Sequence, residues 1–301
     1  EYVEEDSLRL TRSAVAYLNQ DAIAQGPNFG GGGSPSLRAL LRDVAKKVPD
    51  PSRQGSVYDV WRKRANLAAD SLEPQMGDPG GGSDFAGFYN HLGIPILDWG
   101  FGGPQGVYHS AYDSYHWMSK FGDPNFEFHA TAARVAAATL LRIANAEILP
   151  YDYVEFSRTM RRFGAAVDSS IADKHWKVSA AGLSAAIGRM ENGAIAFSSA
   201  RDRALTAQLP SATARQVNGA LLQVERQLTR EKGLVTRPWF RNLIYASDEN
   251  NGYSTMVLPS VNEAIRLRDE AAVARELEDL ARRFDAATRA LQRATRLLTA
   301  T

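Results

Sequence analysis

The sequence predicts an α/β fold for residues 1–150, followed by an all-helical part over residues 151–301. Two observations support this division. Before Pro150, short apolar runs that are typical of strands alternate with segments of helical period. After Pro150, the helical-period segments are rich in alanine, leucine and arginine, and we expect no strand there. Alternating strands and helices are typical of a layered α/β architecture.

The composition is that of an ordinary globular protein. The 301 residues are 44% hydrophobic and 23% charged, and the net charge is +1. Because this balance lacks the strong positive field of nucleic-acid-binding proteins, we expect no nucleic-acid partner. The absence of cysteine excludes disulfides, thiolate catalysis and cysteine-ligated zinc. The start at Glu1 has neither a methionine nor a signal-peptide pattern, so we expect a fragment or a processed form of a longer protein.

The first half is expected to contain two strands and several helices. We expect the end of a helix over 7–12, a strand over 14–18, helices over 36–47, 56–69 and 84–92, a buried strand over 93–98, and a long helix over 126–149. Ser36 is predicted to cap its helix, and Pro150 to end the long one. The run of glycines between Gly26 and Ser36 is predicted to be a loop. It lacks the lysine-containing pattern of a phosphate-binding loop.

The second half is expected to contain helices only. Helical periodicity is present over 158–170, 180–190, 195–205, 213–228 and 261–298. Alternating charges along the last segment are typical of a half-exposed helical hairpin. Residues 233–259 are irregular and aromatic.

Two residues stand out as candidate metal ligands. Asp21 follows the first predicted strand, and His109 lies in a tyrosine-rich segment after a loop of glycine and proline. Strand ends and loops often carry the functional side chains of such folds, and carboxylate and imidazole are common zinc ligands. Taken alone, Asp21 could also be a turn or helix-cap residue, and His109 a packed loop histidine.

Several short motifs follow one another along the chain. They are Ala16-Tyr17-Leu18-Asn19 with Asp21, Ser83-Asp84-Phe85, Tyr108-His109-Ser110, Asp123-Pro124, Leu149-Pro150, Arg237-Pro238 and Gly252-Tyr253. In this order and spacing, the chain resembles the C-terminal portion of the glutamate carboxypeptidase family of transferrin-receptor-like di-zinc exopeptidases. The resemblance implies that residues 1–150 are the C-terminal half of a three-layer α/β/α zinc-exopeptidase domain. Residues 151–301 would be a helical dimerisation domain, through which members of the family form homodimers.

The resemblance also implies a site with two zinc ions. Asp21 matches a ligand of the first zinc, and His109 matches a ligand of the second. Tyr108 matches a tyrosine that donates a hydrogen bond to the oxyanion formed when water attacks a terminal peptide bond. The other ligands and the glutamate base would precede Glu1. Since a catalytic zinc takes about three protein ligands, we expect this chain alone to bind zinc weakly and to be inactive.

Substrate-binding positions follow from the same resemblance. Gly82, Ser83 and Tyr253 match residues that contact a peptide substrate. Gly252 stands where the family's carboxypeptidases have a lysine, and the predicted loop over 98–106 lacks the arginines that bind an acidic side chain. Loss of these cations predicts a broader specificity, or a preference for neutral or apolar residues.

Other interpretations stay open. One is a non-catalytic binding and dimerisation protein like the transferrin receptor, in which the loop histidine is replaced, whereas this chain keeps His109. Another is a zinc aminopeptidase, because aminopeptidases use the same paired metals. Glu1 and Glu4 match a pair that helps to hold a structural calcium ion. The usual location of the family predicts an extracytoplasmic parent protein, either periplasmic, secreted or membrane-anchored.

Overall fold

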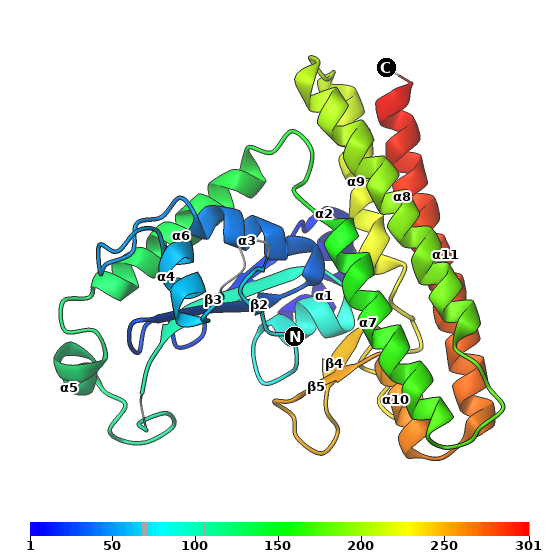
Figure 1. Cartoon of the computed structure of the whole chain (residues 1–301), viewed down its shortest axis with the longest axis horizontal. Helices are drawn as coiled ribbons and strands as arrows, with labels where there is room; N and C mark the ends of the chain where they lie inside the picture. The colour runs from blue at the N-terminus through cyan, green and yellow to red at the C-terminus, as the bar shows by residue number, and fades with distance from the viewer. Residues whose placement is uncertain (68–71, 105, 301) are drawn as a thin grey trace.

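The computed structural model describes residues 1–67, 72–104 and 106–300. A small sheet with helices packed on it forms one side of the molecule, and long helices form the other side (Figure 1). The sheet side is built by the first half of the chain and the helical side by the second half. The α/β-to-helical division expected from the sequence is therefore visible, whereas the layering of a whole exopeptidase domain stays a prediction.

The sheet side contains three strands. Its elements are α1 (Tyr2–Glu5), α2 (Ser7–Ser13), β1 (Tyr17–Asn19), β2 (Asn28–Gly33), η1 (Pro35–Leu37), α3 (Arg38–Ala45), α4 (Val57–Arg64), η2 (Gly87–His91), β3 (Ile96–Gly102), α5 (Tyr115–Trp117), η3 (Met118–Gly122) and α6 (Glu127–Ala144). The strand order is β1-β3-β2, with β1 parallel and β2 antiparallel to the central β3. Helices α3 and α4 contact β2, and α6 contacts β3.

The prediction of a loop over the glycine run is wrong, because four of these glycines belong to β2. They pair with β3 from Gly30 opposite Gly100 to Gly33 opposite Leu97. A Cβ on Gly33 would lie 2.3 Å from the carbonyl oxygen of Ile96, and φ there is +128°. Glycine therefore lets this strand approach β3 so closely, and backbone pairing replaces the packing that side chains usually supply.

Two helix ends also differ from the prediction. Ser36 does not cap α3; its hydroxyl instead donates to the buried carboxylate of Glu225. The long helix α6 ends at Ala144 and not at Pro150, because Asn145 leaves the helical conformation and its side chain donates to the carbonyl oxygen of Leu141 at 3.0 Å. By contrast, Ser56 caps α4 and forms a reciprocal capping box with Asp59, although α4 ends earlier than expected, and residues 68–69 of the predicted helix lie outside the described ranges.

The helical side contains two strands that were not expected. Its elements are α7 (Tyr153–Ala172), α8 (Ala181–Thr206), α9 (Ser211–Arg226), β4 (Tyr245–Ser247), β5 (Thr255–Val257), α10 (Pro259–Arg266) and α11 (Glu270–Thr299). β4 and β5 pair as an antiparallel hairpin within the aromatic segment. The two helices predicted over 180–205 are one continuous helix, α8. The last predicted helix is divided at Arg268, which has a φ of +56°, and Asp269 caps α11.

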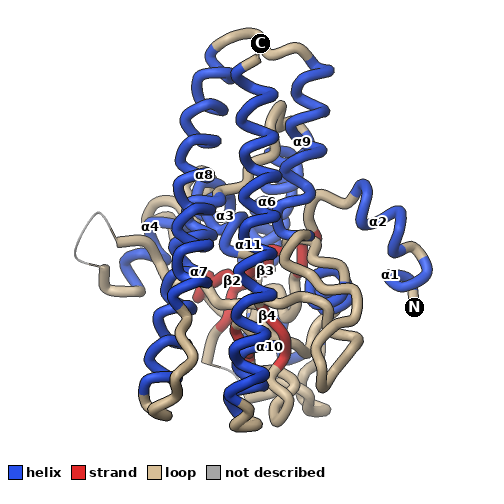
Figure 2. The backbone as a smooth tube through the Cα atoms, turned by 90° about the vertical axis from the view of Figure 1, so that its right-hand side faces the viewer, coloured by secondary structure: helices blue, strands red, loops and turns tan. Residues whose placement is uncertain are grey.

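Figure 2 shows α8, α9 and α11 side by side along the helical part, and the contacts between them confirm this packing. Their buried faces carry residues such as Leu183, Phe197, Leu221 and Phe284. Among the residues described, no helix combines the length and the apolar character that are needed to span a bilayer.

Among the described residues, the larger of two apolar clusters runs through both halves. Buried polar contacts also connect the two. The amide of Asp152 donates to the carbonyl oxygen of Ser36 at 2.7 Å. The hydroxyl of Tyr151 donates to the carbonyl oxygen of Val15 at 2.6 Å. The side chain of Arg226 donates to the carbonyl oxygen of Ala14 at 2.6 Å. A boundary between domains at residue 150 stays a prediction, since the packing is continuous across it.

Candidate functional site

The candidate site includes a cavity of about 550 Å³ that is lined partly by residues of β2 and β3. The glycines of β2 form one wall, the loop over residues 77–81 forms another, and Asp21, Asp98 and Trp99 contribute side chains. Because that wall consists of glycines, no side chains from β2 fill the cavity on that side. None of the described residues that line it is an arginine or a lysine.

Asp21 lies in the exposed turn that follows β1, as the sequence predicts for a strand-end carboxylate. Asp98 on β3, which pairs with Asn19 in the sheet, lies close to this turn. Burial, together with the charge of Asp21, raises the pKa of Asp98 to about 6, whereas a hydrogen bond from Asn19 opposes the shift. The charge of Asp21 therefore acts on Asp98 at one rim of the cavity.

Asn19 connects three parts of this site. It is 4% exposed, and its amide donates to the hydroxyl of Ser83 at 3.1 Å and to the carboxylate of Asp98 at 3.4 Å. Ser83 lies just before η2, so the buried amide holds the loop that contains Ser83 against the end of β1. This contact fixes the position of a residue that was predicted to bind substrate.

Tyr108, Tyr253 and Gly82 come together although they are far apart in the sequence. The hydroxyl of Tyr108 lies near that of Tyr253, and the interaction between them is the main cause of a raised pKa of Tyr108, to which the charge of Asp21 also contributes. The backbone at Gly82 has a φ of +77°, and a Cβ there would lie 2.5 Å from the ring of Tyr253. Glycine is therefore required for this close approach.

His109 contacts this group of residues through its neighbour Tyr108. Its ring stacks on that of Tyr108 with centroids 3.8 Å apart, and both side chains are exposed. The backbone of His109 has a φ of +56°, which is uncommon for a residue with a side chain and turns the chain sharply at this point. The structure thus brings together Tyr108, His109, Tyr253 and Gly82, with Asp21 close enough to affect Tyr108.

The residue types fit zinc, but the set is incomplete. Asp21 and His109 offer one carboxylate and one imidazole, and a catalytic zinc takes about three protein ligands. Within the described ranges, no group of three histidine, cysteine, aspartate or glutamate side chains could hold a metal ion. Two zinc ions would therefore need further ligands from outside this set.

The glutamates matched to a calcium site have other partners in this structure. Glu4 accepts a hydrogen bond from the indole of Trp239 at 2.7 Å, which is the main cause of its lowered pKa. The terminal ammonium group of Glu1 lies 3.5 Å from the Glu4 carboxylate. Two other histidines have partners away from the cavity: His91 bonds to the carbonyl oxygen of Trp239, and His129 to the buried carboxylate of Asp123.

The sequence interpretation missed Asn19 and Asp98 as parts of the site. Asp98 was expected at the end of a buried strand and the start of a loop, but it lies inside β3. A lone carboxylate within the apolar run from Ile94 to Phe101 is the signal that could have indicated it, since an unpaired charge is costly to bury. For Asn19, the sequence offered only its place beside Asp21 at the end of a strand.

The chain is similar to known proteins over most of its length. The family model of the transferrin receptor-like dimerisation domain matches residues 178–292. A probable glutamate carboxypeptidase of Arabidopsis thaliana, LAMP1, is 34% identical over 266 residues, which are 88% of this chain and 37% of that protein. A second from the same plant, AMP1, is 31% identical over 302 residues, or 97% of this chain and 41% of that protein.

An animal relative is named for a different activity. The aminopeptidase NAALADL1 of Rattus norvegicus is 26% identical over 317 residues, which cover 99% of this chain and 42% of that protein. The chain thus spans about two fifths of the length of these curated relatives. It belongs to the transferrin-receptor-like family of glutamate carboxypeptidases and related peptidases, and it corresponds to the C-terminal portion of the family's members.

Proposed function

We propose that this chain supplies the C-terminal part of a co-catalytic di-zinc exopeptidase. In this proposal Asp21 ligates one zinc and His109 the other, and the remaining ligands and the general base come from sequence that precedes Glu1 in the natural protein. Bound zinc would polarise the scissile carbonyl and lower the pKa of a water molecule. The observation that carries the proposal is the convergence of Tyr108, His109, Tyr253 and Gly82 beside the Asp21 cavity.

Tyr108 has the properties of an oxyanion donor. Because its pKa is raised, its hydroxyl stays protonated at neutral pH and can donate a hydrogen bond to a negatively charged oxygen. Its present partner, Tyr253, is 62% exposed and can turn towards a substrate. Gly82 and Ser83 place backbone and hydroxyl groups at the same edge, where they would orient the peptide.

The cavity supports the expected preference for neutral or apolar residues. Besides Asp21, its described lining contains the carboxylates of Asp98 and of Asp78, the second of which pairs with Arg38, and no cationic side chain. An acidic substrate side chain would therefore meet like charge there.

We propose the same extracytoplasmic location as for the family, which a cell-fractionation experiment with the natural host would test.

Metal content and hydrolysis test the proposal directly. In the natural full-length protein, the variants Asp21→Asn and His109→Ala should each lose zinc and reduce kcat/KM by at least about 100-fold, since each removes one ligand. His175→Ala is the matched control, because that histidine is exposed on the helical side and should leave both unchanged. Two zinc ions per chain and full activity in either site variant would refute the assignment.

The substrate panel also separates two activities. A carboxypeptidase would cleave N-acetylated dipeptides, whereas an aminopeptidase requires a free amino group. The aminopeptidase named among the relatives makes this second activity a real candidate. If neither substrate type is cleaved by a zinc-loaded protein, a binding role would replace the enzymatic one.

The match to the dimerisation domain supports a homodimer. We propose that the exposed faces of the helical side form the contact between two copies. Ile195 on α8 lies within the matched region and is 46% exposed. Ile195→Glu should shift the mass measured by analytical ultracentrifugation from dimer to monomer, because a charge is costly to bury in an interface. An unchanged dimer would place the contact elsewhere.

A further inference from the structure

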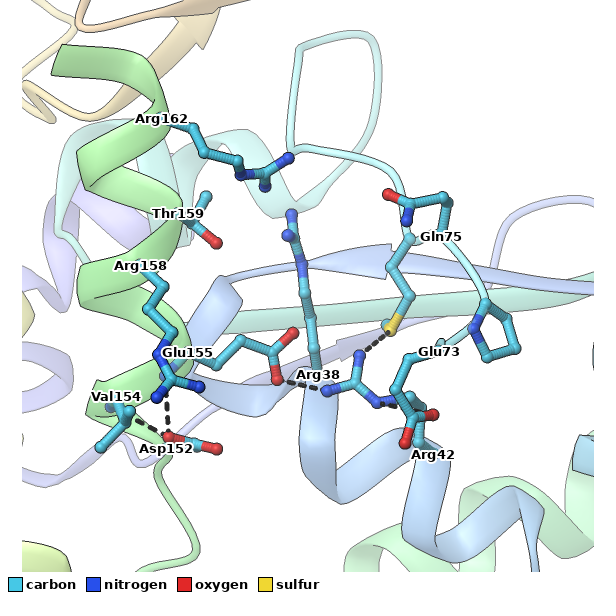
Figure 3. A pocket seen from close by; sticks show the side chains of 12 residues that line it. Arg38, Arg42, Glu73, Gln75, Asp152, Val154, Glu155, Arg158, Thr159 and Arg162 are labelled. Carbon is cyan, nitrogen blue, oxygen red and sulfur yellow. Dashed lines mark hydrogen bonds and ion pairs between the residues drawn. The ribbon is translucent and has the colours of Figure 1, made fainter. Parts of the chain in front are cut away.

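A second cavity, of about 560 Å³, lies between α3 and α7 and is separate from the candidate site (Figure 3). Four arginines line it, two from each helix. They are Arg38 and Arg42 on α3 and Arg158 and Arg162 on α7. So many cations at one cavity require either carboxylate partners or an anionic ligand.

The carboxylates that line this cavity already have partners. Arg42 binds Glu155 and also lies 3.5 Å from the carboxylate of Glu73. Asp152 caps α7 and accepts hydrogen bonds from the amides of Val154 and Glu155 at 2.9 Å each. One end of the cavity is therefore neutralised by its own residues.

The other end has donors without enough acceptors. Arg38 is only 5% exposed, and one of its terminal nitrogens donates to Asp78 and, at 3.4 Å, to the carbonyl oxygen of Gly77. The carboxylate oxygen of Asp78 that it contacts also accepts a hydrogen bond from the hydroxyl of Tyr245 at 2.8 Å. The Nε of Arg38 is buried and has no hydrogen-bond partner among the described residues.

Arg162 and Thr159 complete this end. Figure 3 shows the guanidinium groups of Arg38 and Arg162 pointing toward each other across the cavity. No hydrogen bond or ion pair joins Arg162 to any residue within the described ranges. Thr159 is 3% exposed and also lines the cavity. It lies on α7 about one turn before Arg162.

We propose that this end of the cavity, formed by Arg38, Thr159 and Arg162, binds the oxyanion of a small molecule that carries a phosphate or carboxylate group. Two guanidinium groups that face each other repel, and an oxyanion between them turns this repulsion into charge-assisted hydrogen bonds. The threonine hydroxyl adds a third donor. Because the cavity is larger than one such group, the rest of the ligand would lie along Met76 and the self-neutralised end.

Thermal unfolding with added anions tests the proposal. Inorganic phosphate and succinate are titrated separately against the full chain, with sodium chloride at equal ionic strength as the reference. We expect a saturable rise in Tm with at least one of the two anions, and the arm that responds identifies the ligand as phosphate-like or carboxylate-like. Isothermal titration calorimetry of the responding anion should give one site per chain.

Two variants locate the binding. Arg162→Ala should weaken binding at least tenfold, and Thr159→Val, which keeps the side-chain shape, should weaken it severalfold. The matched control is Arg215→Ala on α9, an exposed arginine with no side-chain partner among the described residues. The proposal is overturned if neither anion raises Tm above the chloride reference, or if Arg162→Ala and Arg215→Ala respond to the anion equally.

Discussion

Asn242 joins the sheet side to the hairpin that carries Tyr253, and its removal should destabilise the whole fold. It is 3% exposed, and its amide group donates to the carbonyl oxygen of Tyr89 at 3.0 Å. Its side-chain oxygen accepts hydrogen bonds from the amides of Ile244 at 2.8 Å and Tyr245 at 3.3 Å. Asn242→Ala removes all three bonds and leaves their backbone partners buried.

The expected loss follows from these contacts. A buried backbone group that loses its only partner costs about 1 to 3 kcal/mol. The amide of Ile244 would lose its side-chain acceptor, whereas the carbonyl oxygen of Tyr89 would keep a hydrogen bond from the amide of Gly93 at 3.0 Å, and the longer bond from Tyr245 adds less. We therefore expect the free energy of unfolding to fall by about 2 to 4 kcal/mol, which is a large share of the roughly 5 to 15 kcal/mol of a typical domain.

Urea unfolding, followed by tryptophan fluorescence, measures this difference. The matched control is Asn192→Ala on α8, an exposed asparagine whose side chain has no hydrogen bond among the described residues. It should change the free energy of unfolding by less than about 0.5 kcal/mol. If Asn242→Ala loses less than about 1 kcal/mol with an unchanged dependence on urea, the reasoning from buried hydrogen bonds is wrong.

Two further predictions concern a buried acid and the glycine strand. Burial raises the pKa of Glu225 to about 7 from its usual 4.5, so the folded state holds a proton that the unfolded state releases between these values. Stability should therefore fall by up to about 3 kcal/mol as the pH rises from 4.5 to 7, and Glu225→Gln should reduce this slope in unfolding measured across that range. Gly33→Ala should cost at least about 2 kcal/mol in the same urea assay, because its Cβ would meet the carbonyl oxygen of Ile96. Gly30→Ala, on the same strand with no heavy atom of the described residues within 4 Å of its Cβ, should cost under about 1 kcal/mol, and equal losses would contradict the steric argument.

Local signals predicted the helices of this protein better than its strands. The capping box of Ser56 and Asp59 marks the start of α4 within the sequence itself. No such signal marks β2, because its four glycines have no hydrophobic alternation. Their strand conformation depends on pairing with β3, which lies far along the chain. The β4–β5 hairpin was missed for a related reason: each strand has three residues, too few for a periodic pattern.

For the candidate site, residues could be selected from the sequence, but their contacts could not. Tyr108 and Tyr253 were selected by family resemblance, and their interaction depends on packing across 145 positions (253 − 108). Whether Asp21 and His109 bind zinc stays a prediction. Asn19 could not be distinguished from a turn residue, because its two side-chain partners lie on separate elements far along the chain.

The buried hydrogen bonds that cross residue 150 affect how this protein can be produced in pieces. A polypeptide starting at residue 151 would lose the Ser36 hydroxyl, which donates to Glu225. It would also lose the carbonyl oxygen of Ala14, which accepts a hydrogen bond from Arg226. One that stops at residue 150 would expose the core surface on which the helical side packs. Neither piece should stay monodisperse in isolation, so bacterial production should keep both halves together, either as one chain or by co-expression.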